Sequence, residues 1–271
     1  YRESKLGEDI RRDSNDRQPQ IYEGQIMGRL ITFGDSWMKG IGAEFEEGMS
    51  EHEYHHLRER DSEHCFRKLI SARFELENLN LSEGGSSNQA QFRVALETFF
   101  GGEKIDLKGT DIVLWGITSV FRTELWHSED NEFRTIFLPW HSAVSKILAT
   151  YHHDEKQELK IVENQIRLWN AYFQTMGVKN YWFNVFNDHK WSQPIDNFLF
   201  EGSSLLSCLI NDYSPNNRYH KSIWNDTDRK IKTAKKHGLV NPFTGHPTKL
   251  GHEKLAELLS DQLTNQGRIV N

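Results

Sequence analysis

Short apolar runs alternate with helical patterns along most of the chain. Continuous apolar segments predict buried β-strands at 30–33, 111–116 and 181–187, and a weaker alternation predicts another at 74–81. Apolar residues at helical spacing predict helices over 92–99, 159–176 and 255–263. Strands that alternate with helices favour a mostly parallel sheet covered on both faces, which is an α/β fold.

The same pattern divides the chain into an N-terminal stretch and a single domain. Residues 1–27 are polar and show no apolar period, so we expect an N-terminal extension, a remnant of cloning or an arm on the surface. Residues 28–271 contain no internal repeat and no low-complexity linker, so we expect one domain. The alternation is poorest at 188–240, which predicts an irregular insertion near the site.

Composition argues against several classes of partner. Of the 271 residues 37% are hydrophobic, enough for a core, and the formal net charge is −6. An acidic chain without a basic face suits neither nucleic acid nor an anionic membrane surface. The apolar runs fall far short of the ~20 residues that a membrane helix needs, and no secretory signal is visible. We expect a cytoplasmic protein, which two widely separated cysteines also suit; none of these features indicates an oligomeric state.

The segment FGDSW contains a candidate for catalysis. Gly34, Asp35 and Ser36 turn the chain at the carboxyl end of a predicted strand, where parallel sheets place their sites. Ser36 is either a nucleophile or a serine that caps a turn. A serine nucleophile needs a base within hydrogen-bond reach and donors for the oxyanion. His246 is a candidate base, because Pro247 favours an extended residue before it, on a loop that enters the last helix.

Four segments in this order resemble the GDSL/SGNH hydrolase superfamily. They are FGDSW (33–37), SEGGSSN (82–88), LWGITS (114–119) and HPTKLGH (246–252). The resemblance implies a flavodoxin-like three-layer α/β/α sandwich and ester hydrolysis through an acyl-enzyme, with Ser36 as nucleophile and His246 as base. It also implies an oxyanion hole made by the backbone N–H groups of Ser36 and Gly85, with Thr118 assisting, and no cofactor or metal. The implied substrates are short acyl esters and acetyl groups on carbohydrate.

The chain departs from the family pattern at two positions. Thr118 stands where the family has an asparagine, and Phe243 stands where it has an aspartate three residues before the histidine. A threonine hydroxyl donates one hydrogen bond with a different reach from an amide, and a phenylalanine cannot orient an imidazole. The orienting acceptor is then a backbone carbonyl, Asn241 or Asp226. Alternatively, a Ser–His dyad acts alone, or the fold binds ligands without cleaving them.

Arg122 lies just past Thr118, close to the predicted site. It either faces an anionic group of a substrate or forms a buried ion pair with Glu124 or another acid.

The segment HEYHH (52–56) matches the His-Glu-x-x-His pattern of zinc peptidases, in which the histidines bind metal and the glutamate activates water. Such helices normally present an apolar face to the core, whereas this segment is surrounded by charged residues. No third ligand can be assigned. We therefore expect chance metal binding by these histidines rather than zinc catalysis.

Overall fold

The computed structural model describes residues 28–265 except 59, 103, 139–141, 152, 190 and 214–222. The predicted extension at residues 1–27 lies outside the described residues. In the described part of the chain, no helix has the combination of length and apolar character that crossing a membrane requires.

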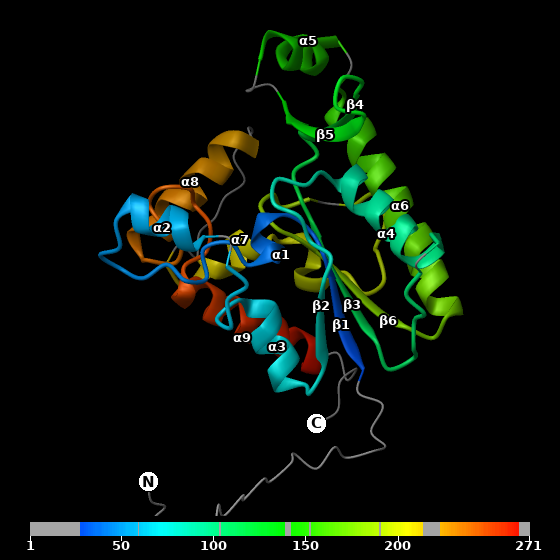
Figure 1. Ribbon diagram of the computed structural model, residues 1–271, viewed down its shortest axis with the longest axis horizontal. Helices are drawn as coiled ribbons and strands as arrows, with labels where there is room; N and C mark the ends of the chain where they lie inside the picture. The colour runs from blue at the N-terminus through cyan, green and yellow to red at the C-terminus, as the bar shows by residue number, and fades with distance from the viewer. Residues whose placement is uncertain are drawn as a thin grey trace, which may run out of the picture.

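Parallel strands form the central sheet, in the order β2–β1–β3–β6 (Figure 1). Their bounds are Arg29–Phe33 for β1, Glu77–Asn80 for β2, Ile112–Ile117 for β3 and Lys179–Asn184 for β6. The strands predicted from the apolar pattern are thereby confirmed. Every residue of β3 is buried, because helices cover both faces, and this explains why the strand has a continuous apolar sequence.

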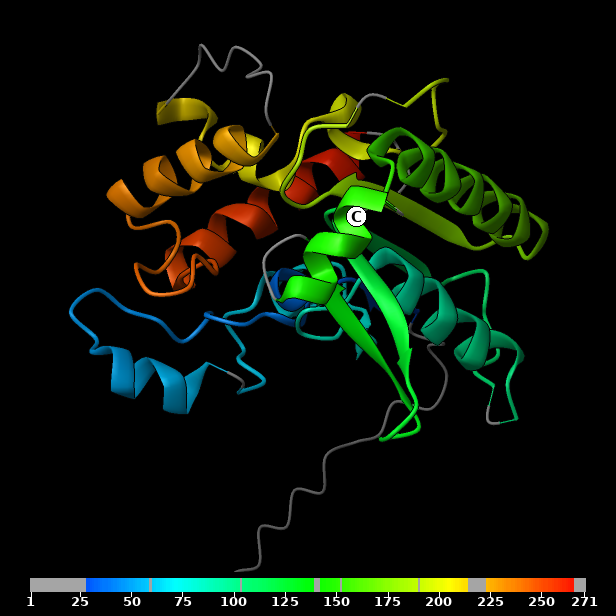
Figure 2. The ribbon, with the colours of Figure 1, turned by 90° about the horizontal axis from the view of Figure 1, so that it is seen from above.

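Helices pack on both faces of the sheet and complete a three-layer α/β/α sandwich (Figures 1 and 2). Successive strand side chains point to opposite faces, so Leu114 packs in the core with α9 and Trp115 in the core with α6. One face carries α3 (Phe66–Arg73), α7 (Leu205–Leu209), α8 (Ile223–Lys236) and α9 (Lys249–Asn265). The other face carries α4 (Asn88–Phe100) and α6 (Glu155–Thr175). The helices predicted at 92–99, 159–176 and 255–263 are confirmed by α4, α6 and α9.

Further elements lie outside these layers. An antiparallel hairpin of β4 (Arg122–His127) and β5 (Glu132–Phe137) follows β3, and α5 (Ala143–Tyr151) follows the hairpin. Figure 1 shows the hairpin and α5 projecting at the top, beyond the carboxyl ends of the strands. The helix α2 (Glu51–Leu57) lies on the same side of the sheet as α8 and α9 in both views.

The segment 188–240 is more regular than its sequence predicts. Its described part contains α7, α8 and two short 3-10 helices, η1 (Leu199–Gly202) and η2 (Asn211–Tyr213). Leu205, Leu206 and Leu209 of α7 are buried in the core. A short helix with three leucines has too few turns to show a helical period in the sequence, and so it was predicted as irregular chain.

The chain leaves β1 and β3 toward opposite edges of the sheet, since β2 flanks β1 and β6 flanks β3. Open α/β sheets bind ligands at such a switch point. The short helix α1 (Ser36–Lys39) begins here, directly after β1. A Cβ at position 34 would lie 2.1 Å from Met38 Cγ, so glycine at this position lets α1 begin close against the end of the sheet.

Candidate active site

Ser36 is the first residue of α1 at the switch point. Asp35, and not Ser36, caps this helix, because Asp35 Oδ1 accepts a hydrogen bond from the Trp37 N–H at 3.0 Å. The alternative that Ser36 is the capping serine is therefore wrong. Ser36 is 6% exposed, so little of it meets solvent.

The Asp35 carboxylate connects the turn around Ser36 to two other segments. Asp35 Oδ2 accepts hydrogen bonds from Thr118 Oγ1 at 2.8 Å and from Arg122 Nη1 at 2.9 Å. The Arg122 Nη1 group also donates to the Ser86 carbonyl at 3.3 Å. Asp35 has no exposed surface in its side chain, so this is a buried ion pair. Arg122 thus pairs with an acid, as one of the two sequence interpretations has it, and the acid is Asp35; Glu124 pairs with Arg93.

The loop 82–88, which contains the candidate oxyanion donor Gly85, lies beside the same turn. The Glu83 N–H donates to the Gly34 carbonyl at 3.1 Å. Gly85 has φ +77°, and no atom lies within 4 Å of the position that a Cβ would take there. In the described part of the chain, neither the Ser36 N–H nor the Gly85 N–H forms a backbone hydrogen bond in a turn or loop.

Thr118 lies in the site, but its donors are engaged. Its hydroxyl donates to Asp35, and its N–H donates to Asn88 Oδ1 at 3.0 Å. Asn88 Nδ2 in turn donates to the Thr118 carbonyl at 3.1 Å. The expectation that Thr118 assists the oxyanion is wrong for this arrangement, since neither donor points to a ligand. Asn88 was missed as a site residue, although it ends the SEGGSSN segment.

The His246 ring contacts two hydroxyl groups. Its Nδ1 lies 2.7 Å from Thr244 Oγ1 and 3.2 Å from the Tyr54 hydroxyl. Thr244 Oγ1 donates to Asn241 Oδ1 at 3.0 Å, and Asn241 Oδ1 also accepts the N–H groups of Phe243 and Thr244. Asn241 Nδ2 donates to the His246 carbonyl at 3.1 Å. Asn241 therefore holds the whole 241–246 loop and acts on the imidazole through Thr244.

These contacts fit the tautomer of the His246 ring that a general base requires. With the Thr244 hydroxyl proton directed to Asn241, Thr244 Oγ1 is the acceptor in its contact with the ring. The ring proton then lies on Nδ1, and the basic lone pair lies on Nε2.

One acceptor considered for His246, Asp226, is engaged elsewhere. Asp226 forms ion pairs with Arg229 and Lys230 on its own helix, at 2.9 Å and 2.6 Å, and is therefore not the residue that orients His246 in this structure. Phe243 contributes no polar group and packs against Phe45, with 6.1 Å between ring centroids. The acceptor at Nδ1 is a side-chain hydroxyl from the residue next to Phe243.

The loop that follows α1 brings the turn of Ser36 against the loop of His246. The Ile41 N–H donates to the Ser36 carbonyl at 3.0 Å. One residue later, Gly42 has φ +96°, and a Cβ there would lie 2.4 Å from the Pro247 carbonyl oxygen and 3.0 Å from His246 Cβ. No direct hydrogen bond between Ser36 Oγ and the His246 ring is recorded for these two described residues.

The HEYHH segment lies in α2, and its polar side chains contact groups of the same helix or of its N-cap. Glu53 belongs to a capping box, in which it accepts the Ser50 N–H at 2.9 Å. His52 Nε2 and His56 Nε2 lie 3.2 Å apart on the exposed face. In the described ranges no cluster of three or more His, Cys, Asp or Glu side chains could hold a metal ion. A glutamate bound to its own helix terminus is not placed to activate water beside these histidines.

No protein-family model and no curated protein matches the sequence. Similar solved structures include an acetyl xylan esterase from Butyrivibrio proteoclasticus, at 11% identity and a TM-score of 0.47, with 91% of this chain and 66% of that chain covered. They also include an esterase from Pseudoalteromonas sp., at 9% identity, TM-score 0.41 and coverages of 88% and 98%. A third is a member of the lipolytic protein G-D-S-L family from Veillonella parvula DSM 2008, at 12% identity, TM-score 0.39 and coverages of 87% and 98%.

These likenesses concern the arrangement of helices and strands. The described chain has a three-layer α/β/α fold, and four of its segments resemble, in the same order, those of the GDSL/SGNH superfamily.

Proposed function

We propose that this protein hydrolyses carboxylic esters, with Ser36 as nucleophile and His246 as general base. The observation that carries the proposal is the support of the imidazole, whose Nδ1 lies 2.7 Å from Thr244 Oγ1, while Thr244 Oγ1 donates to Asn241 Oδ1. This support keeps a lone pair on Nε2, as abstraction of a serine proton requires. The packing of Gly42 against the His246 loop supports the pairing of the two residues.

In the proposed reaction Ser36 Oγ attacks the ester carbonyl, and its proton passes to His246 Nε2. The oxyanion accepts hydrogen bonds from the backbone N–H groups of Ser36 and Gly85. The Nε2 proton then passes to the departing alcohol. A water molecule, deprotonated by the same nitrogen, releases the acid from Ser36. Substrate binding brings Oγ within reach of Nε2, since catalytic hydrogen bonds often tighten only in the substrate complex.

The substrate class that we propose is a short acyl ester, including acetyl groups on carbohydrate. It follows from the resemblance of the four segments to the family.

A second candidate function is ligand binding without cleavage. It is favoured by the neutral hydroxyls of Thr244 and Tyr54, which lie 2.7 Å and 3.2 Å from His246 Nδ1. Neutral hydroxyls orient an imidazole but stabilise an imidazolium less than a carboxylate does.

The deciding experiment compares Ser36→Ala with a matched serine variant. Ser71→Ala is the control, because Ser71 is buried in α3 and its Oγ has no hydrogen-bond partner within the described residues. We expect Ser36→Ala to lose p-nitrophenyl acetate hydrolysis and labelling by a fluorophosphonate, while Ser71→Ala keeps both. If the wild-type protein does not hydrolyse p-nitrophenyl acetate and is not labelled by a fluorophosphonate, the result favours the binding function.

A further inference from the structure

The side chain of Arg122 joins the two segments that carry the proposed oxyanion donors. Arg122 is the first residue of β4 and follows β3 at the carboxyl end of the sheet. Its Nη1 donates to Asp35 Oδ2 at 2.9 Å and to the Ser86 carbonyl at 3.3 Å. Asp35 directly precedes Ser36 in the chain. Ser86 directly follows Gly85. One guanidinium nitrogen therefore links the residues that lie next to both proposed donors.

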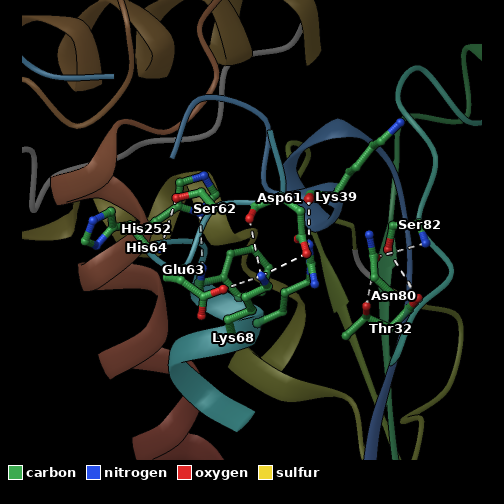
Figure 3. Close-up of polar contacts among 12 residues, drawn as sticks. Thr32, Lys39, Asp61, Ser62, Glu63, His64, Lys68, Asn80, Ser82 and His252 are labelled. Atoms are coloured by element: carbon green, nitrogen blue, oxygen red, sulfur yellow. Dashed lines mark hydrogen bonds and ion pairs between the residues drawn. The ribbon is translucent and has the colours of Figure 1, made fainter. Parts of the chain in front are cut away.

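The loop 82–88 is fixed at both of its ends. Figure 3 shows Asn80 bonded to Ser82 where the loop begins, and this hydrogen bond is 3.1 Å long. Where the loop ends, the Asn88 side chain exchanges two hydrogen bonds with the backbone of Thr118, at 3.0 Å and 3.1 Å. The loop is thereby anchored to β2 on one side and to the end of β3 on the other.

The middle of the loop is held by Arg122. Gly85 has φ +77°, and no described atom lies within 4 Å of the position that a Cβ would take there. The Ser86 N–H donates to the Glu83 carbonyl inside the loop, whereas the Ser86 carbonyl accepts from Arg122 outside it. A glycine in open space has wide conformational freedom. The contact with Arg122 therefore limits the positions that the Gly85 N–H can take.

Two aromatic rings and a buried carboxylate fix the Arg122 guanidinium. Its Cζ lies 5.4 Å from the ring centroid of Phe186 and 5.7 Å from that of Phe137. The Phe186 ring packs in turn against Trp37, with 5.2 Å between centroids. The Asp35 side chain has no exposed surface, and that of Arg122 is 16% exposed. A planar cation held by two rings and an acid has few orientations open to it, so Nη1 stays directed at its two acceptors.

We propose that Arg122 is a positioning residue of the ester hydrolysis, which sets the separation between the backbone N–H groups of Ser36 and Gly85. It acts through Asp35 on one side and through the Ser86 carbonyl on the other. The carbonyl oxygen of an ester gains its full negative charge only in the transition state, so the placement of these donors acts on kcat more than on substrate binding. This role rests on the proposed function.

The first experiment replaces Arg122 by lysine. Lysine keeps a positive charge beside Asp35, so the fold is expected to survive, but lysine lacks the planar fork of the guanidinium. Active sites are counted by titration with a fluorophosphonate, and rates of p-nitrophenyl acetate hydrolysis are given per labelled site. We expect kcat to fall about tenfold and KM to stay within about twofold, because loss of a whole oxyanion donor costs about 10²–10³ in kcat and a displaced donor keeps part of its effect.

The matched control is Arg93→Lys. Arg93 also pairs with a largely buried carboxylate, that of Glu124, and also lies over an aromatic ring, that of Phe133 at 4.9 Å. Its acceptors Glu124 and Glu97 lie outside both segments of the proposed oxyanion hole. We expect Arg93→Lys to keep the wild-type kcat per labelled site. An unchanged kcat in Arg122→Lys as well would overturn the role of Arg122.

A second measurement uses a trifluoromethyl ketone, which separates positioning from a general effect on the fold. Ser36 Oγ bonds to its carbonyl carbon, the serine proton passes to His246, and the electron pair of the C=O double bond moves to the oxygen. The adduct thus holds an oxyanion that needs the same two donors. We expect its Ki to rise in Arg122→Lys about as much as kcat/KM falls, and to stay unchanged in Arg93→Lys. A lower kcat with an unchanged Ki would refute the role in oxyanion positioning.

A further variant keeps the proposal testable if Arg122→Lys does not fold. Asp35→Asn/Arg122→Gln removes both charges of the ion pair and keeps a side-chain oxygen at position 35 to cap α1. We expect the same fall in kcat and the same rise in Ki, and wild-type values would refute the role. A wild-type protein that neither hydrolyses esters nor reacts with the fluorophosphonate would refute the proposed function and this role with it. An active wild type whose Arg122 variants keep both values would refute the role alone.

Discussion

Replacing Thr244 by valine removes the hydroxyl that lies 2.7 Å from His246 Nδ1 and keeps the shape of the side chain. In the proposed reaction His246 becomes cationic in the transition state, so the lost contact is a hydrogen bond to a charged group, which is worth about 1.5–3 kcal/mol. Each 1.36 kcal/mol in the barrier changes the rate about tenfold. The Tyr54 hydroxyl, 3.2 Å from the same nitrogen, remains as a substitute partner and reduces the loss. We therefore expect kcat/KM to fall about tenfold.

The assay is the pH dependence of kcat/KM for p-nitrophenyl acetate, with circular dichroism to check the fold. Thr264→Val is the control, because the hydroxyl of Thr264 donates to the Ser260 carbonyl in the same helix, α9. Thr244→Val combined with Tyr54→Phe should cost more than either change alone, since both hydroxyls meet one ring nitrogen. If Thr244→Val keeps the wild-type rate and pH profile, Thr244 does not orient the base.

Three other variants test the surroundings of the site. Arg122→Ala should lower the free energy of unfolding in urea by about 2–3 kcal/mol, because it leaves the buried Asp35 carboxylate without its cation; an unchanged midpoint would contradict this. Burial lowers the pKa of His252 to about 3, below the unfolded value of about 6.5, so protonation favours the unfolded state and stability falls as the pH drops below about 6.5. The wild type should lose about 2 kcal/mol more than His252→Gln between pH 7.5 and pH 5, and equal losses would refute the assignment. Gly42→Ala should cost about 1–3 kcal/mol and lower the melting temperature, because a Cβ there meets the Pro247 carbonyl at φ +96°; unchanged melting would show that the two loops are not in close contact.

The sandwich could be predicted from the sequence because its elements are long and buried. The strand β3 is buried along its whole length, and α6 presents Val162, Ile166 and Phe173 to the core at regular spacing. Burial of a whole face imposes a period on the apolar residues, and the period can be read directly. By contrast, α7 is too short to show one, so this helix was predicted to be irregular chain.

The polar contacts of the site could not be predicted in the same way. Tyr54 and His246 are 192 positions apart, and Asp35 and Arg122 are 87 apart. No period along the chain links such pairs; their meeting depends on how loops pack at the carboxyl end of the sheet. The sequence therefore indicated Ser36 and His246 by their motifs, while Asn88, Tyr54 and Thr244 became visible as partners only in three dimensions.

The polar groups around His246 and Ser36 differ from those of a Ser–His–Asp triad in what they can do for the imidazole. Such a carboxylate fixes the tautomer of the imidazole and also stabilises its positive charge. Here the hydroxyl of Thr244 and the amide of Asn241 provide the first effect, since they accept and pass on the Nδ1 hydrogen bond. The buried carboxylate of Asp35 does not provide the second, because Arg122 and Thr118 take its Oδ2 and Trp37 takes its Oδ1. In the proposed reaction we therefore expect these groups to orient the imidazole but to stabilise its positive charge less than a carboxylate does, which would lower kcat.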